Sequence, residues 1–121
     1  MCAPLGPLWS AVVTGPLTVS TVNVNGIRAA VKQRSAENLG LLPWLQQTTA
    51  DVVCLQETRA DDEQLAAALA PALADGWHLA SATAHVKGRN GVALLSRAPF
   101  DNVRIGCGAE EFACPGRYIE A

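Results

Sequence analysis

Two asparagines and a glutamate stand at positions where they can share one site. Asn23 and Asn25 close a Val- and Thr-rich run, residues 17–24, and Glu57 follows the apolar run 52–55. Runs of this kind predict strands, the second of them buried on both faces. If the two strands are adjacent and parallel, the polar side chains that follow them meet at one rim of the sheet, where open sheets place their sites.

Carboxylate and amide oxygens suit a hard divalent cation. Magnesium prefers oxygen ligands, keeps several waters, and is commonly held by one or two carboxylates together with substrate phosphate. Glu57 with a side-chain oxygen of Asn23 fits that description, and the ion would polarise a phosphoryl oxygen during hydrolysis. Taken singly, Asn23 and Asn25 are equally typical of a turn, and Glu57 of a surface acid. Only the combination indicates metal-assisted phosphoryl chemistry.

Basic residues occur near these candidates. Two groups contain no acid: Arg28, Lys32 and Arg34, and then Lys87, Arg89 and Arg97. The net charge of −2 argues against a strongly basic nucleic-acid binder but leaves room for a local basic groove. Without a motif beside them, both groups equally describe solvated faces.

The rest of the chain supplies elements to position these residues. Apolar runs predict further strands at 77–82, 92–96, 102–105 and 117–121. Helices are expected at 28–33, at 38–47 with Pro43 limiting the start, and from the acidic residues 61–63 to about residue 73. This order predicts an α/β (α+β) fold, a mixed sheet covered by helices.

Composition bounds the class of protein. Hydrophobic residues make up 50% and charged residues 17%, which is typical of a globular chain. No two of the four cysteines have the close spacing of a zinc or redox motif, so a reduced, cytoplasmic protein is the simplest interpretation, with Cys54 in the core. Residues 1–16 are expected to be a flexible tail, and no run reaches the roughly 20 apolar residues of a membrane helix.

Four segments resemble successive blocks of one enzyme family. They are VNVNGIRA at 22–29, LQET at 55–58, GVALLS at 91–96 and GRYI at 116–119. In this order and at these distances they resemble the exonuclease III and apurinic/apyrimidinic endonuclease family, within the endonuclease/exonuclease/phosphatase superfamily. The resemblance covers residues 17–121, and it implies a four-layer α-β-β-α sandwich of which this chain, as a truncated domain, is about the first half.

The resemblance also implies an activity. Such enzymes are Mg²⁺-dependent DNA-repair hydrolases, with Mn²⁺ as the alternative metal, that cleave double-stranded DNA 5′ to abasic sites and trim 3′ ends. The resemblance further implies that the full-length protein is a monomer and has no membrane partner. The glutamate of the LQET block binds the metal in the family, which carries over to Glu57, and Asn23 inherits a place in the same site. Asn25 is assigned to the outer metal shell.

Residues that contact DNA carry over position by position. Arg28 and Lys32 match positions that grip backbone phosphates, and Arg89 occupies a loop position where relatives often place an aromatic residue or His. The family's catalytic Tyr, its Asp-x-Asn pair and its closing Asp-His pair come later in the family's order, and the resemblance places them beyond Ala121. None of them is therefore expected in this chain, and residues 1–121 alone are expected to be inactive.

Other candidates and other interpretations carry less weight. His78, His85 and Tyr118 are not expected to replace the later catalytic residues, and the Gly-Cys-Gly at 106–108 is expected to be a loop turn rather than a nucleotide loop. A phosphatase or phosphodiesterase of the wider superfamily, acting on lipid or inositol phosphates, is the nearest rival. A non-catalytic DNA-binding fragment is the alternative from another class.

Overall fold

The computed structural model describes residues 15–83, 88–106 and 116–121. Its elements in chain order are β1 (Val19–Asn23), α2 (Ile27–Ala30), α3 (Leu41–Gln47), β2 (Val52–Gln56), α4 (Asp62–Ala68), α5 (Ala70–Ala74), β3 (His78–Ala82), β4 (Val92–Ser96), β5 (Arg104–Ile105) and β6 (Ile119–Glu120). Of the tail expected at 1–16, only residues 15 and 16 are described, and both are exposed. None of the described helices is long and apolar enough to cross a membrane.

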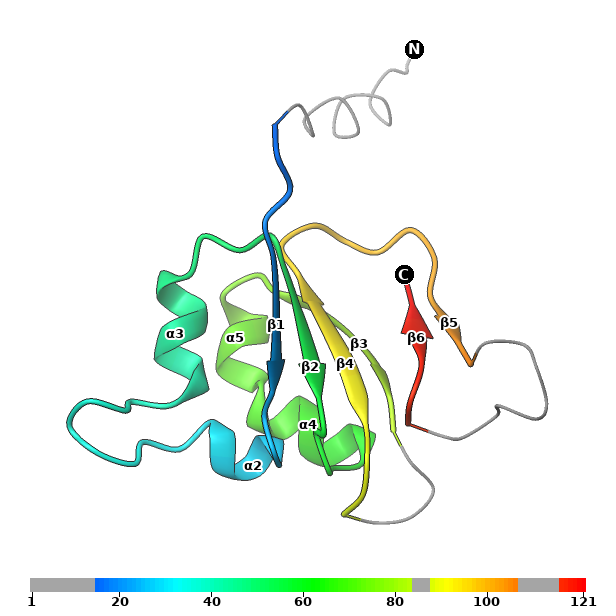
Figure 1. Ribbon diagram of the computed structural model, residues 1–121. Coiled ribbons are helices and arrows are strands. Elements are labelled where there is room, and N and C mark those ends of the chain that lie inside the picture. Colours follow the sequence, from blue (N-terminus) through cyan, green and yellow to red (C-terminus); the bar gives the residue numbers. More distant parts are fainter. Residues whose placement is uncertain (1–14, 84–87, 107–115) are drawn as a thin grey trace.

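A mixed four-stranded sheet forms the centre of the structure, in the order β1-β2-β4-β3 (Figure 1). β1 and β2 are parallel, with Val19 opposite Val52 and Asn23 opposite Gln56. β4 is antiparallel to β2 on one side and to β3 on the other. The expected mixed sheet is confirmed, but β4 lies between β2 and β3, so the strand order differs from the chain order.

The helices cover one face of this sheet (Figure 1). Because side chains alternate along a strand, β2 directs Val53 and Leu55 into the core and β4 directs Ala93 and Leu95. Each helix contributes buried apolar side chains to the same cluster: Ile27, Leu45, Leu65, Leu69 and Ala72 among them. A buried aliphatic side chain of this size contributes about 1.5–3 kcal/mol, so this core anchors the loops that leave β1 and β2.

The long helix expected from residues 61–63 to 73 is two short helices. α4 begins with a capping box, in which the Gln64 N–H donates to Asp61 Oδ1 at 2.7 Å and the Asp61 N–H donates to Gln64 Oε1 at 3.1 Å. Leu69, at φ −96°, separates α4 from α5. The cause is Pro71, which lacks an N–H and whose ring hinders the preceding turn.

The two earlier helices are also shorter than expected. α2 ends at Ala30 rather than residue 33, and α3 begins at Leu41 rather than residue 38. Gly40 precedes α3 with φ 94°, and a Cβ at that position would lie 2.7 Å from the carbonyl oxygen of Lys32. A backbone that only glycine adopts easily therefore sets the start of α3.

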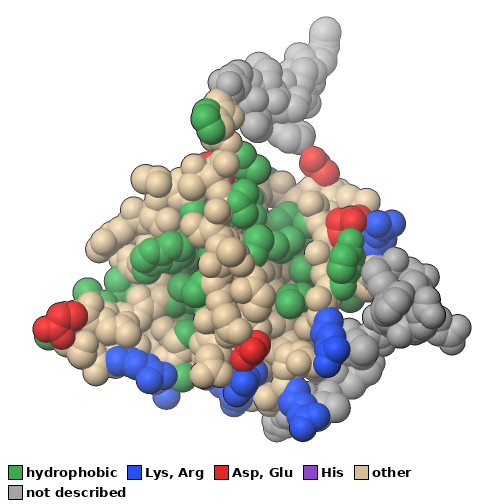
Figure 2. Space-filling view, viewed as in Figure 1, with side chains coloured by type: hydrophobic (Ala, Val, Ile, Leu, Met, Phe, Trp, Pro, Cys, Tyr) green, Lys and Arg blue, Asp and Glu red, His purple; other side chains and the backbone are tan. Residues whose placement is uncertain are grey.

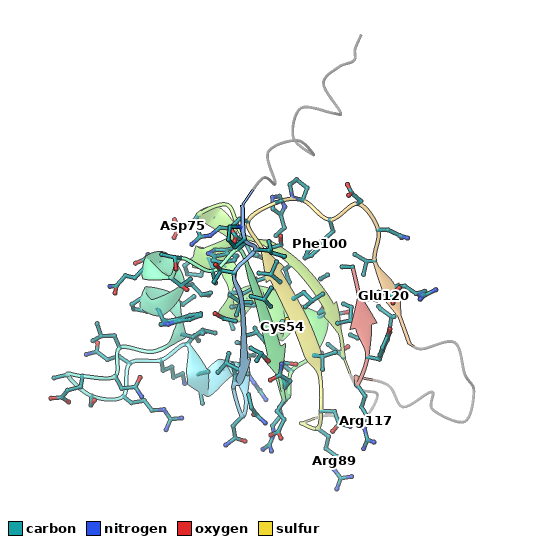
Figure 3. The ribbon with its side chains drawn as sticks, turned by 45° about the horizontal axis from the view of Figure 1, so that its top comes forward. Cys54, Asp75, Arg89, Phe100, Arg117 and Glu120 are labelled. Carbon is teal, nitrogen blue, oxygen red and sulfur yellow. The ribbon has the colours of Figure 1, made fainter. Side chains whose placement is uncertain are left out.

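The opposite face of the sheet is only partly covered. A two-stranded sheet of β5 and β6 lies against it, with β6 contacting β3 and β4 (Figure 1). Ala80 and Ala82 of β3 are buried on that side, whereas Val19 of β1 is 54% exposed. Cys54, expected in the core, is half-buried on this second face because it alternates with Val53 and Leu55 (Figure 3).

The two strands of this smaller sheet are shorter than expected. β5 covers only residues 104 and 105 of the expected strand 102–105, and β6 only residues 119 and 120 of the expected strand 117–121. Ala121 follows β6, exposed and outside the strand, which corrects the expected bound. The physical reason is pairing: a strand extends only as far as it faces a partner, and β5 and β6 face each other over two residue pairs.

Candidate metal and phosphate site

Asn23, Asn25 and Glu57 lie at one rim of the four-stranded sheet, the lower edge in Figure 1. β1 ends at Asn23 and β2 ends at Gln56, and the parallel register places these two residues opposite each other. Glu57 is the residue that follows β2, and it therefore lies beside the end of β1. The convergence expected for parallel strands is confirmed.

Backbone hydrogen bonds tie the two loops together. The donors and acceptors are Val24 N–H to Gln56 O (3.0 Å), Gly26 N–H to Glu57 O (2.8 Å) and Ile27 N–H to Thr58 O (2.9 Å). Asn25 and Glu57 both have positive φ, 46° and 54°. Asn adopts this conformation readily, but for Glu it is uncommon and persists only where surrounding bonds hold the backbone.

The Glu57 carboxylate lies in an environment that favours its ionised form. A side-chain hydrogen bond with Asn23 lowers the pKa of Glu57, desolvation opposes this, and Arg59 lowers the pKa further through a hydrogen bond and its charge. Arg59 Nη2 lies 2.9 Å from Glu57 Oε2. Glu57 is therefore available as an anionic oxygen ligand.

Asn23 serves the turn and the carboxylate together. Its Oδ1 accepts from the Asn25 N–H at 3.0 Å, a local bond that Asn forms in turns. An ionised carboxylate only accepts hydrogen bonds, so the interaction through which Asn23 lowers the pKa of Glu57 comes from its amide NH₂. An amide oxygen has two lone pairs, so Oδ1 keeps one for a cation. The turn role and a metal role are compatible.

Thr58 connects the loop that carries Glu57 to the residues just before β4. Its side chain is fully buried, and among the described residues its hydroxyl has no hydrogen-bond partner. The Thr58 N–H donates to Gly91 O at 3.1 Å, and the Arg59 N–H donates to Asn90 O at 2.8 Å. Gly91 has φ 97°, and a Cβ there would collide with Thr58 Oγ1. Only glycine fits this contact.

Two adjacent shallow pockets lined by basic side chains lie at this rim, and Glu57 lines the first of them. The first, of about 380 Å³, is lined by Glu57, Arg59, Gly88, Arg89, Asn90 and Arg117. The second, of about 420 Å³, is lined by Gly26, Arg28, Ala29, Lys32, Arg59 and Gly88. Figure 2 shows Lys and Arg side chains gathered along this edge, and Figure 3 shows Arg89 and Arg117 projecting from it. Arg28, Lys32 and Arg89, from the two basic groups in the sequence, thus line these two adjacent pockets.

The residues that form this rim belong to a region that is similar to known proteins. The sequence matches the Endonuclease/Exonuclease/phosphatase family over residues 20–119. The chain belongs to this family. The rim that carries Asn23 and Glu57 lies inside the matched region.

Three relatives illustrate the family. The chain is 35% identical over 97 residues to an exodeoxyribonuclease of Bacillus subtilis, covering 80% of this chain and 34% of that protein. It is 30% identical over 105 residues to the DNA repair nuclease APEX1 of Danio rerio, covering 87% and 32% respectively. An AP endonuclease from Archaeoglobus fulgidus has a similar structure, with a TM-score of 0.63, 29% identity, and coverage of 81% of this chain and 34% of that one. This family member thus spans about a third of the length of the relatives it matches.

Arg59 and Arg117 also line the pocket beside Glu57, and sequence reasoning did not single them out. Arg59 follows the LQET block directly, and Arg117 lies within the GRYI block. Arg59 lies near Glu57 because both belong to the loop after β2. Arg117 lies near Glu57 because the fold places residue 117 beside that loop. A basic residue two positions after a candidate metal ligand was the available signal for Arg59.

The remaining sequence candidates lie elsewhere. His78 pairs with Ser96, and Ser96 with Val52, so His78 is at the sheet end opposite Glu57. Tyr118 donates from its hydroxyl to Glu120 at 3.0 Å. Arg97 stacks on Trp77 at 3.9 Å from the ring centroid, which makes it a structural residue rather than part of a basic groove. His85, Lys87 and most of the Gly-Cys-Gly segment lie outside the described residues.

Proposed function

We propose that the complete protein of which this chain forms a part is a metal-dependent DNA-repair phosphodiesterase. It would cleave the phosphodiester 5′ to abasic sites and trim 3′ ends. The observation that carries the proposal is the position of Glu57 beside the end of β1 and Asn23, in a pocket lined also by Arg89 and next to one lined by Arg28 and Lys32. The names of the relatives, an exodeoxyribonuclease, a DNA repair nuclease and an AP endonuclease, support it.

The oxygen donors at the rim fit Mg²⁺ or Mn²⁺. Glu57 would supply a carboxylate and Asn23 its amide oxygen, with Asn25 in the outer shell. Among the described residues, no group of three or more His, Cys, Asp and Glu could hold a metal. Mg²⁺ is often held by one or two carboxylates, waters and a substrate phosphate. When bound, the ion would stabilise negative charge on the phosphoryl oxygens.

Basic side chains would hold the DNA backbone on both sides of Glu57. Arg28 and Lys32 line one pocket and Arg89 lines the other. Phosphate contacts of this kind position DNA without reading its sequence, which suits an enzyme that acts on a backbone lesion. Among the described residues that line the two pockets, Glu57 is the only acid or His. Following the resemblance, we assign water activation to other residues of the family domain.

Cleavage of defined duplexes by the complete protein tests the proposal. With Mg²⁺, a duplex that contains one abasic site is expected to be nicked 5′ to that site, and a duplex with free 3′ ends to be shortened. EDTA is expected to abolish both reactions. A duplex of the same sequence with blocked ends and no abasic site is the control and should stay intact.

The same assay separates the alternatives. Hydrolysis of inositol phosphates or phosphorylated lipids, with no DNA cleavage, would assign the protein to another branch of the superfamily. DNA binding without any hydrolysis would support a binding module instead. Either outcome would overturn the proposed activity while leaving the family membership unchanged.

A further inference from the structure

Arg59 forms an ion pair with Glu57, the carboxylate that would bind the proposed metal. Its Nη2 lies 2.9 Å from Glu57 Oε2, and the two side chains are 45% and 41% exposed. The backbone of Arg59 is held on both sides, because its N–H donates to Asn90 O and its carbonyl accepts from Arg28 Nη2 at 3.3 Å. The side chain is therefore the part of Arg59 that is free to change partner.

Arg59 also adjoins both basic pockets. Of the described residues, only Arg59 and Gly88 line both pockets, and Gly88 has no side chain. From one fixed backbone position, the guanidinium can pair with Glu57 or with an anion in either pocket. Guanidinium groups bind phosphate as well as they bind carboxylate, because their planar N–H donors match both.

A divalent cation and Arg59 compete for the same carboxylate. While Arg59 is paired with Glu57, the pair carries no net charge, and among the described residues no second carboxylate lines either pocket. An exposed ion pair is weak and gives little resistance to exchange. A divalent cation can therefore displace Arg59 from Glu57. Because it must break this ion pair, its affinity is lower than it would be for an unpaired carboxylate.

We propose that Arg59 is a built-in counterion, which pairs with Glu57 in the metal-free protein, leaves when the divalent cation binds, and then contacts a DNA phosphate. This rests on the proposed metal role of Glu57. Metal binding would then create a new phosphate contact, so that metal and DNA each strengthen the binding of the other. Such coupling between two ligands is reciprocal.

Mn²⁺ affinity of the complete protein without DNA tests the competition. Free Mn²⁺ is followed by its electron paramagnetic resonance signal, which needs no catalysis. Arg59→Gln is expected to tighten Mn²⁺ binding about two- to fivefold, the range set by an exposed ion pair. Arg59→Lys keeps the charge and is expected to stay near the unsubstituted protein.

Arg117→Gln is the matched control. Arg117 lines the same pocket as Glu57, yet no ion pair joins the two among the described residues. Unchanged or weaker binding in Arg59→Gln, or an equal gain in Arg117→Gln, would overturn direct competition. Glu57→Gln is expected to abolish this Mn²⁺ site. If Glu57→Gln leaves Mn²⁺ binding intact, the proposed metal site itself fails, which is a distinct result.

The salt dependence of DNA binding tests the second half of the switch. The probe is a closed dumbbell duplex, which has neither ends nor an abasic site and so is not a substrate for the proposed reactions. With Mg²⁺, Arg59→Gln is expected to lower the slope of log affinity against log salt by about one. In EDTA the two slopes are expected to agree, because Arg59 is paired with Glu57. Equal loss of slope in both conditions would show a permanent phosphate contact and overturn the switch.

Discussion

At the scale of single residues, the site depends on one carboxylate with several partners. Glu57 interacts with Asn23 and Arg59, and both lower its pKa. Asn23 in turn accepts a bond from the backbone of Asn25. Among the described residues the pockets contain no other acid, so none of these residues can replace the Glu57 carboxylate.

Glu57→Ala in the complete protein is expected to reduce Mg²⁺-dependent cleavage on the order of 100-fold or more, since the main anionic metal ligand is lost. The Glu57 side chain is partly exposed, so the thermal unfolding midpoint should stay close to that of the unsubstituted protein. Glu63→Ala, at an exposed position in α4, is the control and should retain cleavage. Full activity of Glu57→Ala at ordinary Mg²⁺ concentrations would remove Glu57 from the site.

Arg28→Gln and Arg89→Gln are each expected to weaken DNA binding equally for all sequences, because the contacts are to phosphates. Each should lower the salt slope of binding by about one. Arg104→Gln is the control, since Arg104 pairs with Glu120 in the second sheet and lines neither pocket. A changed sequence preference with an unchanged slope would indicate base contacts instead.

At the scale of elements, the loop after β2 is held by its neighbours rather than by its own residues. The loop after β1 donates to it through Gly26 and Ile27, and the start of β4 accepts from it at Gly91. Thr58 is buried in the middle of this junction. The position of Glu57 therefore depends on three strands meeting at one rim.

Gly91→Ala is expected to destabilise the complete protein by about 2–4 kcal/mol, through positive-φ strain and overpacking against Thr58. Gly76→Ala isolates the first effect, because Gly76 has φ 105° and no atom within 4 Å of an added Cβ. It should cost only about 1–2 kcal/mol. In urea unfolding, Thr58→Ala combined with Gly91→Ala should cost less than the sum of the two. Strict additivity would show that the two residues are not in contact.

At the scale of the whole molecule, the described sheet has a covered face and an open one. The helices bury one face, whereas β5 and β6 cover only the part of the other face near β3 and β4. β1 is an edge strand in the described sheet. Exposed apolar side chains near it include Leu17, Val19 and Val22. Edges and patches of this kind favour aggregation.

Residues 1–121 expressed alone are expected to aggregate, to unfold without a cooperative transition, and to show no Mg²⁺-dependent cleavage of an abasic duplex. Under the proposed function the water-activating group lies outside these residues, and its loss by itself should reduce the rate by about 100-fold or more. Thermal unfolding followed by circular dichroism, with the cleavage assay beside it, provides the measurement. A cooperative transition with robust cleavage would contradict both expectations.

The strands and the convergence of Asn23 with Glu57 could be predicted from the sequence, because they depend on local apolar runs and on the geometry of parallel strands. The helix lengths were predicted less well. The break between α4 and α5 reflects Pro71, and the late start of α3 reflects Gly40. In both cases a backbone constraint at one residue overrides a helical pattern.

The sequence by itself therefore determined the family, the strand segments and the two polar loops that meet at the rim. Only the tertiary structure decided that β4 pairs between β2 and β3, that Gly91 packs on Thr58, and that Arg59 pairs with Glu57. Local runs depend on neighbours in sequence and can be recognised one segment at a time. Ion pairs and close contacts depend on side-chain positions set by segments far apart in the chain, which come together only when the sheet is assembled.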